Sequence, residues 1–248
     1  MRGSMAGTCV HLAVAVELNQ RFCMQTYHYL GQMGKQYVPE LFFAGNICPD
    51  GIMARKNYQR AMKLHSHLRD GIPDGSFQKI ENLALFRQRL RDFFLQNVYE
   101  QGREFSLYLG YLTHMLTDEK FILEIHPHVL QAIEAAGYSR QDPEMYALFG
   151  KDVDQIDFRL VKEYPGMEQA HQALRKVSPY EITDMITEQE LTDSREWILS
   201  YFFEREHMTQ QPVFLSYERM YRFIAETVDE ILHRLPEYLL HDGMVWDQ

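Results

Sequence analysis

The 248-residue chain predicts an all-α fold, and three observations lead to that prediction. Apolar residues recur mainly three and four positions apart, which is the spacing of an amphipathic or buried helix. No segment combines alternating apolar and polar residues with hairpin turn signals, as strands would. The sequence also contains neither an internal repeat nor a low-complexity tract. We therefore expect a single compact multi-helix bundle that spans residues 1–248.

Proline and glycine divide the first half into expected elements. Thr8 is expected to cap a helix over residues 10–29, and Pro39 opens a short apolar segment over residues 40–46. Pro49-Asp50-Gly51 predicts a turn, because proline fixes the backbone and glycine tolerates the conformation that follows. Two glycines and a proline interrupt the pattern at residues 71–75. The remaining helices of this half are expected over residues 58–68, 80–100 and 104–118.

The second half continues the helical pattern. Pro127 opens a helix over residues 127–136 that Gly137 ends, and a longer one over residues 143–164 is expected to break near Gly150. Residues 177–190 are a candidate linker, although they are short and not flexible in composition. Further helices are expected over residues 166–176, 188–206 and 217–235.

Charge and cysteine content narrow the class of protein. The net charge is −10, from 25 Lys and Arg against 35 Asp and Glu, which disfavours coating of nucleic acid or of an anionic membrane. The three cysteines form no CxxC pair and are expected to be reduced thiols. No apolar stretch approaches the roughly 20 residues that span a bilayer, and residues 10–16 are too short for a secretory core. We expect a cytoplasmic protein, with its oligomeric state open.

The segment 105–118 is the most informative part of the chain. Nearly all of its residues are apolar or aromatic, which predicts a helix buried on all sides, yet His114 and Asp118 lie on one face a single turn apart. A buried carboxylate is costly unless it is paired or bound to a metal. Gly110, one turn earlier, lets another helix or an ion come close. The pair is therefore either a structural hydrogen bond or part of a metal site.

Three more candidates precede this helix. His11 lies in the first apolar helix, Asp50 in the proline turn, and His67 in the segment Lys63–Arg69; His65, on a different face, is expected to be solvated. Two imidazoles and two carboxylates make a sound set of donors for a divalent metal and suit zinc. The expected metal-binding core extends over about residues 8–160, and the helices of residues 166–240 pack behind it.

These residues occur in motifs that resemble those of the zinc-dependent phospholipase C family, which is related in fold to the S1/P1-type nucleases. In chain order, the motifs are a histidine, Gly-Asn-Ile-Cys-Pro-Asp, Ser-His-Leu and Gly-Tyr-Leu-Thr-His-Met-Leu-Thr-Asp, within residues 8–125. The resemblance implies an all-α bundle in which Asp50, His67, His114 and Asp118 hold one zinc ion. It implies further that His11 helps to hold a second ion, that Asp118 bridges the two, and that Asp50 accepts or orients the proton of the attacking water.

The chain departs from the family at two places. The secreted enzymes use a free amino terminus as a ligand, whereas His11 here follows ten residues, and no downstream His, His and acidic set matches in spacing. Asp154 is the candidate replacement ligand, while Asp152 and Asp157 beside it are expected to lie on a solvated face. Three other downstream candidates, Glu124, His126 and His128, are expected to be surface or cap residues.

The sequence therefore predicts a zinc-dependent hydrolase of phosphoester bonds, acting on a small phosphodiester or a phospholipid-headgroup compound. One alternative is a non-catalytic helical domain braced by a structural metal. Another is a helical HD-type metal phosphohydrolase, which needs a His-Asp dipeptide between an upstream His and a downstream Asp. The only His-Asp dipeptide, His241-Asp242, lies almost at the end of the chain, which is the wrong order.

Overall fold

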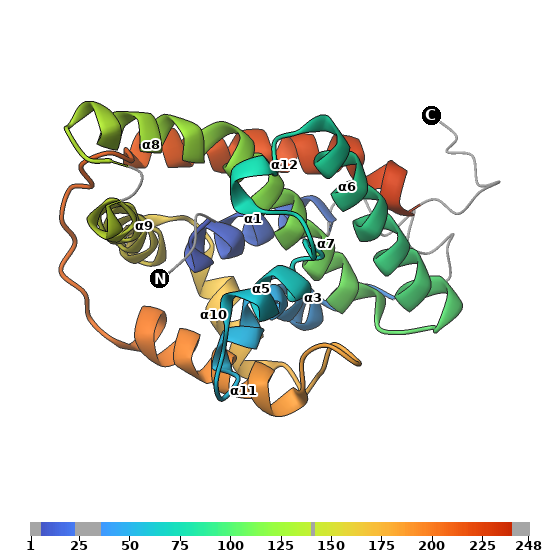
Figure 1. Cartoon of the computed structure of the whole chain (residues 1–248). Coiled ribbons are helices and arrows are strands. Elements are labelled where there is room, and N and C mark those ends of the chain that lie inside the picture. Colours follow the sequence, from blue (N-terminus) through green and yellow to red (C-terminus); the bar gives the residue numbers. More distant parts are fainter. Residues whose placement is uncertain (1–5, 23–35, 140–141, 240–248) are drawn as a thin grey trace.

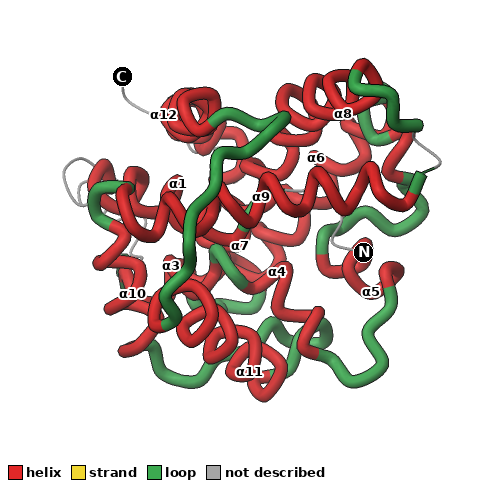
Figure 2. The backbone as a smooth tube through the Cα atoms, turned by 90° about the vertical axis from the view of Figure 1, so that its left-hand side faces the viewer, coloured by secondary structure: helices red, strands yellow, loops and turns green. Residues whose placement is uncertain are grey.

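The fold is all-α, as the sequence predicts. The structure is a computed structural model that describes residues 6–22, 36–139 and 142–239. Within these ranges the chain forms helices and loops only (Figure 2), apart from an isolated antiparallel bridge between Ile182 and Ile186. None of the described helices is long and apolar enough to cross a membrane.

The first half of the chain supplies the helices that surround the site. They are α1 (Thr8–Arg21), α3 (Pro39–Gly45), α4 (Cys48–Gly51), α5 (Arg60–Ser66), α6 (Ile80–Leu95) and α7 (Phe105–Lys120), with short 3₁₀ turns at Ile52–Ala54 and Asp74–Ser76. Two of these helices run on into single π-helical turns, α6 into Gln96–Glu100 and α7 into Phe121–Ile125.

The second half wraps around this group (Figure 1). Its helices are α8 (His126–Ala135), α9 (Pro143–Glu163), α10 (Met167–Lys176), α11 (Glu188–Ile198) and α12 (Tyr217–Leu239), and α11 runs on into a π-helical turn at Leu199–Glu204. An extended strap, residues 205–216, crosses the outside of the molecule from this turn to α12.

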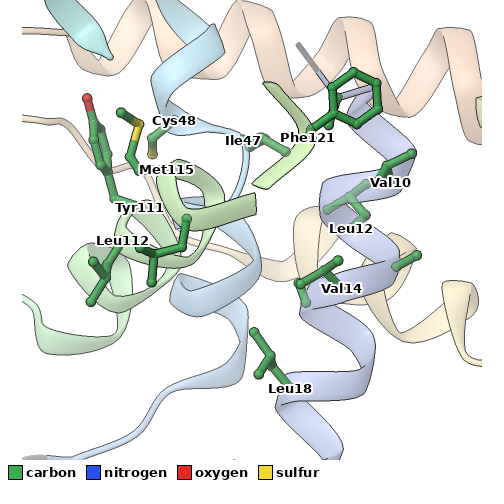
Figure 3. Packing of buried hydrophobic residues seen from close by; sticks show 14 of the residues in the cluster. Val10, Leu12, Val14, Leu18, Ile47, Cys48, Tyr111, Leu112, Met115 and Phe121 are labelled. Atoms are coloured by element: carbon green, nitrogen blue, oxygen red, sulfur yellow. The ribbon is translucent and has the colours of Figure 1, made fainter. Parts of the chain in front are cut away.

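Two helices, α1 and α7, form the centre of the core. Every residue of α7 is buried, because α3, α1, α6 and α12 all pack against it. Figure 3 shows how α1 contributes Val10, Leu12, Val14 and Leu18 to the buried apolar cluster that also contains side chains of α7. A helix that is apolar all round can be accommodated only at such a central position, so the prediction for the segment 105–118 is confirmed.

Helices α3 and α7 pack backbone to backbone in the core. Gly45 and Gly110 face each other, and a Cβ atom at Gly110 would lie 2.8 Å from the Cα of Gly45 and would overlap the carbonyl of Phe42. The absence of both side chains lets the two backbones touch. This contact holds α3 and the following α4 directly against the helix that carries His114.

Some sequence predictions about elements are wrong. Gly7, not Thr8, is the N-cap of α1, because the carboxylate of Asp157 accepts the amide hydrogen of Cys9 and replaces a side-chain cap. Pro49-Asp50-Gly51 is not a plain turn but belongs to the one-turn helix α4, with the proline in its first turn, where a missing amide hydrogen costs nothing.

Two further predictions fail because packing overrides local preference. Helix α9 passes through Gly150 without a break, since Phe149 and Ile156 are both buried on either side of it. Residues 177–190 are not a linker, because Ile182 and Ile186 are buried in the core. The thiols of Cys9 and Cys48 are free and buried, and Cys23 lies outside the described residues.

Candidate metal centre

Five side chains from four segments form one cluster, with Asp118 near its centre. Its carboxylate lies 3.3 Å from Nε2 of His11, 3.5 Å from Nε2 of His67 and 3.6 Å from Nε2 of His114. Asp50 extends the cluster, with Oδ1 lying 3.4 Å from Nε2 of His67. The donor atoms form two overlapping sets, each within 4.8 Å: His11, His114 and Asp118, and Asp50, His67 and His114.

Several side-chain atoms of this cluster have no hydrogen-bond partner. They are Nδ1 and Nε2 of His11, Nε2 of His67 and His114, and Oδ2 of Asp118. Oδ1 of Asp50 accepts no hydrogen bond from the other members and is paired only with the ammonium of Lys63. All of these atoms are buried, and the three imidazoles are 1% exposed. Buried polar atoms are nearly always satisfied, so several unsatisfied ones at one point need an explanation. A cation that these lone pairs would share supplies that explanation.

Backbone carbonyls orient two of the imidazoles. Nδ1 of His67 donates to the carbonyl of Lys63 at 2.8 Å, and Nδ1 of His114 donates to the carbonyl of Asn46 at the same distance. Because the hydrogen sits on Nδ1 in both rings, Nε2 presents its lone pair to the cluster. Histidine ligands of metals are commonly held in this way.

Two carboxylates, Asp118 of the cluster and Asp157 of α9, fix the start of α1. The amide of Ala6 donates to Oδ1 of Asp118 at 3.2 Å, and that of Cys9 donates to Oδ1 of Asp157 at 3.1 Å. These bonds hold α1 so that the ring of His11 stacks on that of His114, with centroids 3.7 Å apart and planes 5° apart. Negative charge at a helix N-terminus is favourable, which adds to the stability of this junction.

Electrostatics favour the protonation states of metal ligands at four of the five groups of the cluster. Burial lowers the pKa of His11, and it lowers that of His67 to about 4. Burial also opposes ionisation of Asp50 and Asp118, yet Lys63 and His67 around Asp50, and His11 and His114 around Asp118, hold both pKa values well below the usual range. The pKa of His114 is raised, since the neighbouring carboxylates of Asp118 and Asp50 outweigh its burial. Ionised carboxylates and neutral His11 and His67 are the ligand forms of these groups.

One side of the cluster opens to a cavity. Asp50 is its most accessible member, with a side chain 15% exposed, against 4% or less for the other four members. Its Oδ1 forms an ion pair with Nζ of Lys63, and both residues line the cavity. The other walls carry the first residues of α1 and, from α9 and α11, a set of apolar and acidic side chains: Phe149, Val153, Asp154, Asp157, Trp197.

The structure brings together five of the six predicted ligands. His11, Asp50, His67, His114 and Asp118 form the cluster described above. The sixth, Asp154, lies on α9 in the cavity wall and is not among the converging donors of the described residues. His65, which lies two residues before His67, is exposed, and its Nδ1 lies 2.8 Å from the carboxylate of Asp70. It is solvated, as the sequence predicts.

Sequence reasoning missed three residues that build the site. Lys63 lies four residues before His67, and this spacing, which puts both on one helix face, is the sequence signal for its place in the site. The carbonyl of Asn46 has no such signal, because backbone acceptors leave no mark in a sequence. Asp157, expected on a solvated face, is 2% exposed and caps α1. The neighbouring Asp152 is also buried and accepts the backbone amides of Val213–Leu215.

Comparisons of the chain with protein-family models, with curated proteins and with solved structures find no match. The likeness to the zinc-dependent phospholipase C family therefore stays a prediction from the motifs. The geometry of the five-residue cluster is the independent evidence for a function.

Proposed function

We propose that the cluster of His11, Asp50, His67, His114 and Asp118 is a divalent metal centre, and that the chain is a zinc-dependent hydrolase of phosphoester bonds. One observation carries the proposal: buried imidazole nitrogens and carboxylate oxygens from four separate segments converge, and the imidazole Nε2 atoms and Oδ2 of Asp118 have no hydrogen-bond partner there. Imidazole nitrogens and carboxylate oxygens together suit zinc better than magnesium or calcium, which prefer oxygen alone.

The choice of phosphoester chemistry is supported by the motifs around these residues and by the cavity beside them. When bound, zinc supplies a water of lowered pKa and neutralises charge on phosphoryl oxygens. Asp50 is the ligand that faces the cavity. We assign it the role of accepting the proton of the attacking water, because a general base must be within reach of that water.

The other members of the cluster have supporting roles. Asp118 lies between the three imidazoles and offers two oxygens, so it can serve two cations. The carbonyls of Lys63 and Asn46 keep His67 and His114 fixed in one tautomer. The stacked ring of His11 completes the donor set from the side of α1.

Metal content is the first test. Protein purified without chelator is expected to contain one or two zinc ions per chain by elemental analysis. The variant His67→Ala should lose at least one equivalent of zinc, whereas His65→Ala, two residues away and exposed, should retain the wild-type content. A wild-type chain that contains no divalent metal, and takes none up on dialysis against zinc, would refute the proposal.

Catalysis is tested separately with a chromogenic phosphodiester, bis(p-nitrophenyl) phosphate. Asp50→Asn and His114→Ala should each lower kcat/KM by at least a hundredfold while the helical circular dichroism remains. Turnover that survives in both variants would contradict the assignment.

A structural metal centre is the second candidate, and the near-complete burial of the three imidazoles favours it. A structural site is closed by four protein ligands and has no catalytic role. In that case metal removal would lower the melting temperature, and none of a panel of phosphodiesters would be hydrolysed. The HD-type alternative rests on His241-Asp242, which lies outside the described residues.

A further inference from the structure

Lys63 places an ammonium group between the cluster and the cavity. The residue is 5% exposed, its Nζ pairs with Oδ1 of Asp50, and both side chains line the cavity. Lysine is rarely buried to this extent, because its charge loses hydration. Asp50 is the only anionic partner of Nζ among the described residues, and it is also a member of the donor cluster.

The role of Lys63 follows from the net charge that the cluster would have with a divalent cation bound. Two carboxylates and one ammonium give the group formed by the cluster and Lys63 a formal charge of −1 while the imidazoles are neutral. One divalent cation changes this charge to +1, and two change it to +3. Excess positive charge that is largely shielded from water is costly, so it attracts an anion from the cavity.

The ammonium is well placed to receive that anion. It has three donors, of which the carboxylate of Asp50 takes one, and its long stem leaves the head free to adjust. Its backbone is fixed independently, since the carbonyl of Lys63 accepts from His67. The opposing charges in the cavity wall are Asp154 and Asp157, and Asp157 is engaged with the amide of Cys9.

We infer that Lys63 is a substrate-binding residue that donates to a non-bridging oxygen of a phosphoryl group held in the cavity. This inference rests on the proposed function and adds the group that recognises its substrate. It predicts that the zinc-loaded protein binds inorganic phosphate, which shares the phosphoryl oxygens of a substrate, and that this binding depends on the charge at position 63.

Isothermal titration of zinc-loaded protein with inorganic phosphate tests the inference. Lys63→Met is expected to weaken phosphate binding at least tenfold and to raise KM for bis(p-nitrophenyl) phosphate at least fivefold. Lys63→Arg, which keeps the charge, should recover most of the affinity. Lys56→Met removes an exposed lysine seven positions away and should bind as the wild type does.

Zinc content, measured on every sample, separates this inference from the proposed function. A wild-type chain that binds no zinc would refute both the proposed function and the role of Lys63. If the wild type is zinc-loaded and active, and both Lys63→Met and Lys63→Arg keep wild-type zinc content, phosphate affinity and KM, only the role of Lys63 is refuted. If Lys63→Met loses zinc while Lys63→Arg keeps zinc but not phosphate affinity, the lysine serves Asp50 rather than the substrate, and the inference is again wrong.

Discussion

Acid should destabilise the metal-free protein in a pH range that His67 determines. This imidazole is buried, and burial lowers its pKa from 6.5 to about 4. Above pH 6.5 it is neutral in both the folded and the unfolded chain, so its contribution to stability is fully present. As the pH falls from 6.5 to 4, His67 is protonated in the unfolded chain but not in the folded chain. The free energy of unfolding therefore decreases over this range.

The magnitude follows from the size of the shift. One pKa unit corresponds to 1.36 kcal/mol, so the fall from 6.5 to about 4 amounts to about 3 kcal/mol for His67. His11, whose pKa is also lowered, adds loss in the same direction. His114 acts oppositely: its pKa is raised, so its contribution is complete below pH 6.5 and is lost as the pH rises through the folded value. Comparison with a single variant isolates His67 from both.

The assay is urea unfolding followed by circular dichroism, in the presence of a chelator, at several pH values between 7.5 and 4.5. The wild type should lose stability more steeply than His67→Gln, which cannot take up a proton at this position. The difference between the two curves should reach about 2.5 kcal/mol at pH 4.5, most of the expected total. His65→Gln, at an exposed position, should follow the wild type. Parallel curves for the wild type and His67→Gln would refute the reasoning.

Two other changes test the packing. Gly110→Ala should destabilise the protein by about 2 kcal/mol in urea unfolding, because overpacking against α3 costs about 3 kcal/mol and alanine's helix preference returns about 1. Gly75→Ala, with nothing within 4 Å of an added Cβ, should be neutral, and equal effects of the two would contradict this account. Asp152→Ala should cost about 3 kcal/mol and speed proteolysis of the strap, since three backbone amides lose their acceptor; an unchanged cleavage rate would argue against it.

Much of the fold can be predicted from the sequence, because a helix is indicated by a local pattern of apolar residues. The extent of α7 and its burial follow from a segment that is apolar on every side. The failures occur where distant contacts decide. Gly150 weakens a helix locally, but the core holds α9 straight through it, and Asp157 caps α1 from a position about 150 residues away.

The site is only partly readable for the same reason. His114 and Asp118 are predictable as a pair because a single helix carries them one turn apart. The positions of His11, Asp50 and His67 beside this pair depend on how four segments pack together. No local sequence pattern specifies that packing. The burial of Lys63 cannot be predicted from sequence, because a lysine in an amphipathic segment is usually solvated. Only its ion pair with Asp50 in the structure shows that it belongs to the site.

The facing glycines of α3 and α7 impose a restriction on sequence change. A steric clash is usually relieved by making the opposite residue smaller, but Gly45 and Gly110 are each already the smallest residue. Enlarging either one therefore has no local remedy and must push the two helices apart. Asn46, whose carbonyl bonds to His114 at 2.8 Å, directly follows Gly45, so such a displacement would reach the imidazole immediately. The tolerance for mutation at this crossing is thus set by the geometry of the cluster as well as by the stability of the core.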